Sequence, residues 1–320
     1  MELSENELIA RLKKFEKKKK PVLRGMGDDG AVVRMPGDNY VFVQDGLVEH
    51  IHFDLTFMDT YRVGKKAVYV NVSDILAMGA LPLYFLVTLG IPEHFHYMDI
   101  MQLYKGMEKA AQEFRVTLIG GDTIATKNDF FVDVSMVGRL MSRHYCGRNM
   151  AQEGDLIGVT GYLGESAFGL SLLKEQRNVS PLNRFVKRYC NPRPPFAIWK
   201  GLMKNNIPHA LMDISDGLLI DLERMMKESR RKAKIFFERL PIPRAIVLQK
   251  KENLSLSGGE DYQFLFTFSG KKLKLLNDVC KYGHISTIGE VVKGKGVELY
   301  RDGKLMNIQS KGYEHFTVSL

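Results

Sequence analysis

The chain has 320 residues, of which 45% are hydrophobic and 26% are charged. This composition excludes a disordered protein and predicts a soluble globular chain of about two domains. The 46 Lys and Arg exceed the 37 Asp and Glu, and the net charge of +9 favours anionic partners without separating nucleic acid from phosphorylated metabolites. The 3 cysteines form no CxxC pair, which excludes a disulfide framework and a cysteine-rich zinc site.

The start of the chain has no apolar signal segment, so we expect a cytoplasmic protein. One stretch is long enough for a membrane span, because Asp74 is the only charge between Lys66 and Glu93. An unpaired carboxylate at mid-bilayer costs about 2.5 kcal/mol or more, and Gly79 and Pro82 interrupt the stretch. A buried helix followed by a buried strand is the better interpretation, and we expect no membrane partner.

In the first half of the chain, short β-branched runs alternate with helical patterns. We predict a helix from Ser4 that ends before Pro21, strands at 31–34, 40–43 and 48–53, a buried helix from Asp59, a strand at 84–90, a helix at 97–114, and strands at 116–119 and 130–137.

A polar, turn-rich segment at 141–154 marks the expected domain boundary, with one domain at 1–141 and a second at 142–320. The second half is predicted to contain strands at 156–160, 235–237, 264–268 and 285–291, and helices from Glu165 and at 195–204, 217–230 and 271–280. Strands and helices mixed in both halves predict an α/β or α+β protein of two domains.

The segment from Gly25 to Gly30 satisfies the pattern G-x-G-x-x-G. A dinucleotide site requires a helix directly after these glycines, whereas a β-type run follows here. Asp28 and Asp29 within the loop would also repel a pyrophosphate. We therefore reject a dinucleotide-binding interpretation, and the sequence contains no GxxxxGK[ST] P-loop either.

Aspartates recur after apolar runs, and the ends of strands are where open α/β sheets place ligands. Carboxylates that converge on one crevice repel each other unless cations neutralise them, and hard oxygen ligands suit Mg²⁺. A single aspartate of this kind is more often a helix cap or a turn former, but the whole set favours a nucleotide-phosphate site with several Mg²⁺ ions. The set comprises Asp28, Asp29, Asp45, Asp74, Asp122, Asp213 and Asp216.

Two acidic segments are more specific. Asp213, Ser215 and Asp216 precede a predicted helix, whose N-terminus favours anions and metal-bound phosphate, although simple capping is the alternative. The run from Ser257 to Tyr262 is typical of a tight loop that delivers acids to a cleft, and a solvated turn is the alternative.

His50 and His52 would share one face of the predicted strand at 48–53. Without a third histidine nearby, contact between His52 and a ligand is favoured over a two-histidine metal site. The basic runs at 17–20 and 230–232 lack interleaved aromatic residues, so solvated surfaces are favoured over nucleic-acid binding.

The motifs occur in the order and spacing of one known family along nearly the whole chain. They are Gly25 to Asp29, Asp45 with Glu49, His52 and Phe53, Asn71 to Ile75, Met78 to Ala80, Gly120 to Thr123, Gly154 and Asp155 with Val159 to Gly161, Met212 to Leu218, and Gly258 to Tyr262. In these segments the chain resembles the thiamine-monophosphate kinases, which share a superfamily with aminoimidazole ribonucleotide synthetase.

The resemblance implies a homodimer whose N-terminal halves pair their sheets into a β-barrel, with an α/β C-terminal half packed against it. It also implies ATP and several Mg²⁺ ions in a cleft between the halves, and transfer of the γ-phosphoryl group of ATP onto the phosphate of thiamine monophosphate. The implied Mg²⁺ ligands are Asp29, Asp45, Asp74, Asp122, Asp213 and Asp216. All of these except Asp29 are also implied to be catalytic, because they hold the ions that act on the phosphates. The implied ATP contacts are Tyr104, Gly121, Asp122, Arg148 and Ser215, and those to the thiamine phosphate are His52, Glu260 and Tyr313.

The chain departs from the family pattern at two places. Gln44 and Gly46 flank Asp45 where the family has a threonine before the aspartate and a bulkier residue after it. Tyr313 stands where the family favours a tryptophan, so a stacking surface is kept but is smaller.

Other functions remain open at this point. Another ATP-dependent enzyme of the superfamily would act on a purine precursor, selenide or a carboxamide of a maturation protein. The selenide branch needs a reactive cysteine near its start, whereas the first cysteine here is Cys146. A nucleic-acid-binding module would follow from the charge of +9, and a silent homologue is disfavoured by the retained aspartates.

Overall fold

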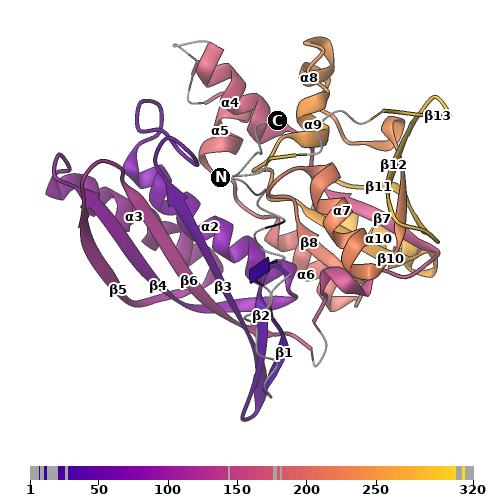
Figure 1. Cartoon of the computed structure of the whole chain (residues 1–320), viewed down its shortest axis with the longest axis horizontal. Helices are drawn as coiled ribbons and strands as arrows, with labels where there is room; N and C mark the ends of the chain where they lie inside the picture. The colour runs from indigo at the N-terminus through magenta and orange to yellow at the C-terminus, as the bar shows by residue number, and fades with distance from the viewer. Residues whose placement is uncertain are drawn as a thin grey trace.

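The chain folds around two β-sheets, one in each half (Figure 1). The computed structural model describes residues 7, 11–12, 21–25, 28–142, 145–175, 179–180, 182–307 and 312–313. The helix expected from Ser4 falls almost entirely outside this set. The mixed α/β class and the two sheet-containing halves expected from the sequence are confirmed.

The N-terminal half forms a six-stranded sheet of order β1-β2-β3-β6-β4-β5, antiparallel except between β4 and β5. Its strands are β1 (Val22–Arg24), β2 (Ala31–Met35), β3 (Asp38–Val48), β4 (Ala80–Pro92), β5 (Thr117–Thr126) and β6 (Phe131–Leu140). Helices α2 (Thr60–Ala77) and α3 (Tyr97–Phe114) lie on either side of β4 in the sequence. The parallel pairing of β4 with β5 requires such a crossover helix.

Helix α2 is buried between this sheet, α3 and the C-terminal half. The helix starts next to Asp59 as predicted, and the Asp59 side chain caps it by accepting a 2.8 Å hydrogen bond from the backbone N–H of Arg62. A Cβ on Gly64 would lie 2.0 Å from the carbonyl oxygen of Leu103, and one on Gly106 would lie 1.9 Å from a carbonyl oxygen of α2. The two helices therefore cross in backbone contact, which only glycine permits.

The stretch weighed as a membrane span divides between α2 and β4, as a buried helix and a strand. Across the described ranges, no helix is both long and apolar enough to cross a membrane.

Strand β5 forms one edge of the first sheet and is exposed along nearly its whole length, at the left of Figure 1. Leu118, Ile119 and Ile124 on β5 are exposed, and so are Tyr84 and Leu86 on the adjacent β4. Apolar side chains around an edge strand are typical of an interaction surface.

The C-terminal half forms a seven-stranded sheet of order β13-β12-β9-β11-β7-β10-β8, in which only β9 and β12 are parallel. Its strands are β7 (Asp155–Thr160), β8 (Leu211–Asp213), β9 (Lys232–Phe236), β10 (Phe264–Ser269), β11 (Ile285–Val292), β12 (Gly296–Arg301) and β13 (Lys304–Leu305). Its α-helices are α4 (Glu165–Glu175), α5 (Arg184–Cys190), α6 (Phe196–Lys204), α7 (Leu218–Ser229), α8 (Arg244–Leu248), α9 (Asn253–Ser257) and α10 (Leu273–Val279). Short 3₁₀ helices occur at Arg148–Met150, Phe237–Arg239, Gly270–Lys272 and Cys280–Tyr282.

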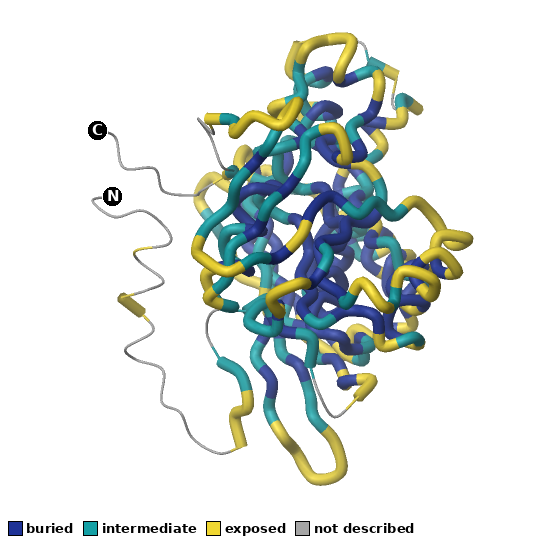
Figure 2. Tube along the Cα trace, turned by 90° about the vertical axis from the view of Figure 1, so that its right-hand side faces the viewer, coloured by how far each residue is buried: buried dark blue, intermediate teal, exposed yellow. Residues whose placement is uncertain are grey.

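The two halves share one hydrophobic core. Trp199 on α6 is fully buried, and its indole N–H donates a 2.6 Å hydrogen bond to the carbonyl oxygen of Leu76 on α2. The rings of Phe196 and Trp199 stack, and Phe196 also meets Phe114 of α3 edge-on. In Figure 2 buried residues run through the middle of the molecule, while the exposed tip of the β2–β3 hairpin projects below it. This shared core holds the facing surfaces of the two halves in place.

The strand predicted at 48–53 is wrong. Strand β3 ends at Val48, and a turn follows in which His50 adopts a left-handed φ of 66°. The N–H of His52 donates to the carbonyl oxygen of Val48 at 2.9 Å, so the two histidines do not alternate along a strand. His50 lies 3.9 Å from Asp54 on the surface, whereas His52 turns into a cleft.

The aspartates do not all follow strand ends, contrary to the pattern used in the sequence argument. Asp45 lies inside β3 and Asp122 inside β5, because both strands continue past the predicted ends. Asp74 lies in the last turns of α2. The rejection of a dinucleotide loop is confirmed, since β2 and not a helix follows Gly30.

Candidate active site

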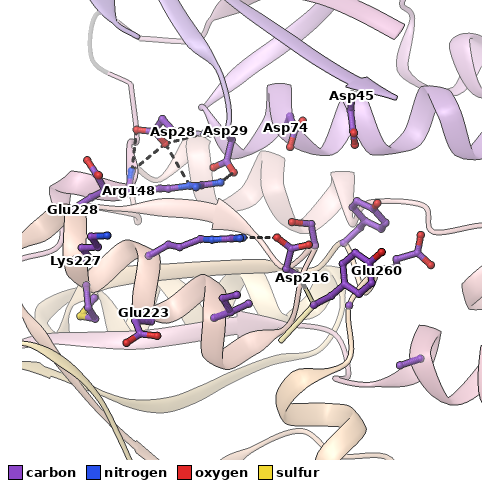
Figure 3. Close-up of a pocket in the computed structure, with 18 of the residues that line it drawn as sticks. Asp28, Asp29, Asp45, Asp74, Arg148, Asp216, Glu223, Lys227, Glu228 and Glu260 are labelled. Atoms are coloured by element: carbon purple, nitrogen blue, oxygen red, sulfur yellow. Dashed lines mark hydrogen bonds and ion pairs between the residues drawn. The ribbon is translucent and has the colours of Figure 1, made fainter. Parts of the chain in front are cut away.

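A cleft of about 1260 Å³ lies between the two halves (Figure 3). The N-terminal half contributes the loop before β2, β3, the turn after it and α2, and the C-terminal half contributes the segment after β8, α7 and the loop after α9. The predicted site residues that line the cleft are Asp28, Asp29, Asp45, His52, Asp74, Arg148, Ser215, Asp216, Glu260 and Tyr313.

Asp29, Asp74 and Asp213 converge from three separate elements, with one carboxylate oxygen of each within 4.8 Å of the others. Oδ2 of Asp29 and Oδ1 of Asp213 are buried and have no hydrogen-bond donor among the described residues. Burial, followed by repulsion from the neighbouring carboxylates, raises the pKa of Asp74 and Asp213 well above the usual range. A divalent cation would relieve both problems, so this carboxylate triad fits a metal ion.

Asp28 and Asp45 form a row with Asp29 and Asp74 along the N-terminal wall of the cleft. Figure 3 shows this row facing Asp216 and Glu260. Burial and then Asp216 raise the pKa of Asp45 to about 7. Burial and then Asp29 raise the pKa of Asp28 to about 6. Acids that resist ionisation because they are close together and buried can ionise once cations bind between them.

Two arginines already neutralise part of this charge. Arg148 forms an ion pair with Asp29, and its backbone N–H donates to Asp28 at 3.3 Å. Burial lowers the pKa of Arg148, but Asp29 and Asp28 raise it by more. Arg224 on α7 pairs with Asp216 and lies 3.0 Å from Asp221. A phosphate group that reached Arg148 would therefore share it with Asp29.

Helix α2 explains why Asn71, Ser73 and Asp74 occur together in the sequence. The amide of Asn71 donates to the carbonyl oxygen of Asp45 at 3.3 Å, and the hydroxyl of Ser73 donates to Oδ2 of Asp213 at 2.6 Å. Asp74 itself belongs to the carboxylate triad. The motif thus supplies one acid and holds two others, which is the outer-shell support that metal sites require.

The segment from Asp213 to Gly217 is shaped by Asp221, a residue the sequence argument missed. Oδ2 of Asp221 accepts hydrogen bonds from the backbone N–H groups of Ser215, Asp216 and Gly217 at 3.1 to 3.2 Å. These N–H groups were expected to favour a ligand anion at the helix N-terminus, but an internal carboxylate occupies them. The side chains of Asp213, Ser215 and Asp216 do not cap α7, because Asp221 binds these N–H groups, and Ser215 and Asp216 line the cleft.

The run from Ser257 to Tyr262 divides its acids between two tasks. Glu260 lines the cleft, whereas Asp261 is buried and accepts hydrogen bonds from Gly164 and Ser166 at the start of α4. Glu260 and Tyr262 both adopt left-handed backbone conformations, with φ of 66° and 44°. Such conformations cost about 1 to 2 kcal/mol in a non-glycine residue and are typical of functional loops.

His52 and Glu260 face the same part of the cleft from opposite halves. Nδ1 of His52 accepts a 3.0 Å hydrogen bond from the N–H of Val48, so the neutral ring carries its proton on Nε2. Lys66 of α2 joins the two segments, because its Nζ donates to the carbonyl oxygen of His52 at 2.6 Å and lies 2.5 Å from Oε1 of Glu260.

Tyr104, Gly121 and Asp122 are not among the residues that line the cleft of the same chain. Gly46, Asp133, Thr88 and Asp122 are paired in one row across β3, β6, β4 and β5. Three steps between strands place Asp122 about 14 Å from the Asp45 end of that row. The glycine at position 121 is also required by packing, since a Cβ there would lie 1.9 Å from the carbonyl oxygen of Val87.

The sequence contained usable signals for two of the missed residues. Lys66 lies eight positions before Asp74 on a helix that was expected to be buried, which places both on one helical face. Asp221 occupies the first turn of α7, where a carboxylate normally caps preceding N–H groups. Arg224 gave no such signal, because its partner Asp216 lies in a loop whose course only the fold determines.

The chain matches two family descriptions in succession. Residues 27–140 match "AIR synthase related protein, N-terminal domain", and residues 152–302 match "AIR synthase related protein, C-terminal domain". The thiamine-monophosphate kinase of Buchnera aphidicola subsp. Schizaphis graminum is 34% identical over 328 residues, which cover 99% of this chain and 100% of that protein. This chain belongs to the thiamine-monophosphate kinase family.

Other relatives agree with that membership. The thiamine-monophosphate kinase of Bacillus subtilis (strain 168) is also 34% identical and covers 91% of this chain and 93% of its own length. A solved structure described as "AaThiL complexed with AMPPCP and TMP" superposes with a TM-score of 0.86 at 31% identity, covering 98% of both chains. The hydrogenase maturation protein HypE in complex with ATP has a TM-score of 0.70 at 18% identity, which shows a shared fold alone.

Proposed function

We propose that this member of the family transfers the γ-phosphoryl group of ATP to the phosphate of thiamine monophosphate, in the biosynthesis of thiamine diphosphate. The observation that carries the proposal is the buried triad of Asp29, Asp74 and Asp213 beside a cleft large enough for two ligands. The relatives named above are thiamine-monophosphate kinases, and one solved relative is described as a complex with AMPPCP and TMP.

The reaction needs no covalent intermediate on the protein. A phosphate oxygen of the acceptor forms a bond to the γ-phosphorus while the bond from that phosphorus to the β,γ-bridging oxygen breaks, and ADP leaves with that electron pair. Catalysis then depends on positioning and on compensation of charge, because both substrates are anionic. A general base adds little, since the attacking oxygen is already ionised.

Mg²⁺, when bound by the carboxylates of the cleft, would supply the positive charge that compensates the anionic phosphates. We propose that Asp29, Asp74 and Asp213 hold one ion, and that the adjacent row, with Asp28, Asp45 and Asp216, completes the set. The orphaned oxygens of Asp29 and Asp213 support this assignment. Ser73 and Asn71 keep the ligands in place before an ion arrives.

We propose that Arg148 and Ser215 contact the nucleotide and that His52, Glu260 and Tyr313 contact the thiamine phosphate. All five residues line the same cleft, and Figure 3 shows Arg148 and Glu260 apart along it, with the acid row beside them. Tyr313 is held by its backbone, since its N–H donates to the carbonyl oxygen of Asp216 at 3.0 Å.

We propose a homodimer that pairs the N-terminal sheets through β5 into a β-barrel. The exposed Leu118, Ile119 and Ile124 on that edge support this partner choice. Tyr104, Gly121 and Asp122 lie on or next to the edge and outside their own cleft. In the dimer we expect them to serve the cleft of the other copy.

Residues 1–141 and 142–320 are proposed as the two domains, each with its own sheet. We also propose a cytoplasmic location, which is supported by relatives that are thiamine-monophosphate kinases. No nucleic-acid partner is proposed, because Asp and Glu outnumber Lys and Arg in the lining of the cleft.

The test is ³¹P NMR of the purified protein with ATP, Mg²⁺ and thiamine monophosphate, beside a reaction without the acceptor. We expect resonances of thiamine diphosphate to grow together with those of ADP. ADP and inorganic phosphate without thiamine diphosphate would keep the nucleotide site and reject the acceptor. No turnover of ATP at all would reject the proposed activity.

A further inference from the structure

Lys66 is fully buried. It contacts His52 and Glu260, two of the residues proposed to bind the acceptor, thiamine monophosphate. Its Nζ donates to the carbonyl oxygen of His52 at 2.6 Å and lies 2.5 Å from Oε1 of Glu260. The ring of Tyr189 on α5 lies below the same ammonium group, 4.6 Å from Nζ to the ring centroid. The three groups that contact the Lys66 ammonium group therefore lie in, or directly behind, the part of the cleft wall that is proposed to bind thiamine monophosphate.

A buried lysine is retained only where its charge is compensated, since an apolar residue would pack into a helix interior at lower cost. Glu260 supplies the compensating charge, and its side chain is partly exposed to the cleft. The pair thus presents one carboxylate to the cleft while the cation stays behind it. Lys66 does not line the cleft itself, so it acts on a ligand only through its partners.

The two segments that Lys66 joins lie outside regular strands. His52 belongs to the turn after β3, and Glu260 belongs to the left-handed loop after α9. The N–H of Glu260 is bound to the carbonyl oxygen of Ser215 at 2.6 Å, so this loop is also tied to the segment with Asp216. Lys66 adds the tie to the N-terminal half.

We infer that Lys66 is a positioning residue for the phosphorylated acceptor, on the basis of the proposed function. It fixes the separation of His52 and Glu260 across the cleft, and it cancels the Glu260 charge that would otherwise repel the anionic phosphate of the acceptor. The nucleotide lies beside the acid row and does not depend on this pair. Loss of Lys66 therefore weakens binding of the acceptor and leaves binding of ATP nearly unchanged.

The experiment compares Lys66→Met with Lys65→Met, its neighbour on the same helix, whose Nζ lies over the ring of Tyr69 instead. We expect Lys66→Met to raise KM for thiamine monophosphate about tenfold or more, with KM for ATP changed less than about threefold. Lys65→Met should leave both constants near wild type. Equal rises in both constants, or the same result in both variants, would overturn the inference.

A second set of variants separates positioning from a loss of folding. The double variant Lys66→Met/Glu260→Gln should raise KM for the acceptor by less than the product of the two single effects, because part of the effect of Lys66 passes through Glu260. The double variant also removes both charges together, so it folds without an unpaired ion. Additive effects of the two substitutions on that KM would contradict the inference.

The proposed function is tested separately by the wild-type protein in the same assay. If the wild type does not phosphorylate thiamine monophosphate, the function is rejected whatever the variants do. If the wild type is active and Lys66→Met keeps a normal KM for the acceptor, the function stands and the role of Lys66 is rejected.

Discussion

The hydroxyl of Ser73 on α2 donates a 2.6 Å hydrogen bond to Oδ2 of Asp213 at the end of β8, across the interface of the two halves. The other oxygen of that carboxylate is buried and has no donor among the described residues, and Asp213 belongs to the triad with Asp29 and Asp74. One oxygen of Asp213 is thus fixed by the protein and the other is available to a cation. The hydrogen bond from Ser73 should therefore affect how well Asp213 binds a cation.

Replacing Ser73 with Ala should weaken the response to Mg²⁺ more than it weakens folding. The hydrogen bond lowers the pKa of Asp213 against the effect of burial, so its loss makes the carboxylate harder to ionise. We expect the Mg²⁺ concentration for half-maximal activity to rise about tenfold or more. Ser171→Ala is the control, because its hydroxyl donates to the carbonyl oxygen of Phe168 and accepts from Lys251, and Ser171 does not line the cleft. An unchanged Mg²⁺ titration in Ser73→Ala would contradict the assignment.

Asp74→Asn should lose turnover while its fold is retained. The substitution removes one of three crowded anions, so repulsion within the triad falls and the metal-free protein is not destabilised by it. We expect kcat to fall by about 100-fold or more, as for removal of a group that organises transition-state charge. Thermal unfolding without Mg²⁺ measures the second half of the prediction, with the exposed Asp129→Asn as control. Full activity of Asp74→Asn at low Mg²⁺ would contradict the proposed role of Asp74 as a metal ligand.

Mg²⁺ should stabilise the protein more at pH 8 than at pH 6. The pKa values of Asp28 and Asp45 are raised in the folded protein, to about 6 and about 7, so the folded state holds protons that the unfolded chain has released. Their contribution to stability is complete below about pH 4 and is lost as the pH rises through 6 to 7. Bound cations remove this loss, because they need the ionised carboxylates.

Thermal unfolding with and without Mg²⁺ at both pH values checks this behaviour. We expect Tm without Mg²⁺ to be lower at pH 8 than at pH 6, and the increase caused by Mg²⁺ to be larger at pH 8 by about 2 °C or more. NaCl at matched ionic strength is the control for screening. A larger increase at pH 6 would mean that these carboxylates do not bind the ion.

Mixing two inactive variants should restore activity if Asp122 serves the other copy of the dimer. Asp74→Asn and Asp122→Asn each damage a different chain's contribution, so a mixed dimer contains one intact cleft. Random mixing of equal amounts then restores roughly one quarter of wild-type activity. The assay is turnover after the two proteins are unfolded and refolded together, with each variant refolded alone as control. No recovery, in dimers that have exchanged, would mean that Asp122 serves the cleft of its own chain, and full activity of Asp122→Asn alone would place it outside both clefts.

Helix 97–114 and the capped start of α2 were predictable because their signals are local. An apolar periodicity and a capping aspartate depend on neighbours within one or two turns. The turn at His50 was not predictable in this way, since a β-type composition there is overridden by backbone hydrogen bonds between Val48 and His52. The continuation of β3 past Asp45 was missed because pairing with β6, and not composition, sets the end of that strand.

In the candidate site, too, the features set by local sequence were predictable and those set by tertiary contacts were not. The aspartates and Glu260 could be named from their motifs, and most of them do line one cleft. Which oxygens lie within reach of a common ion could not be named, because Asp29, Asp74 and Asp213 come from the loop before β2, from α2 and from β8, which meet only in the fold. Lys66 and Asp221 were missed because their partners are set by loop geometry.

The sequence alone determined the fold class, the family resemblance and the chemical character of the site, because these depend on residue types and local spacing. Only the tertiary structure decided how the acids divide their tasks. Asp213 pairs with Ser73 and Asp216 with Arg224, while Asp261 holds the start of α4. The physical reason is that the ionisation and orientation of a carboxylate depend on burial and on charges within a few ångströms, and these neighbours are distant in the chain.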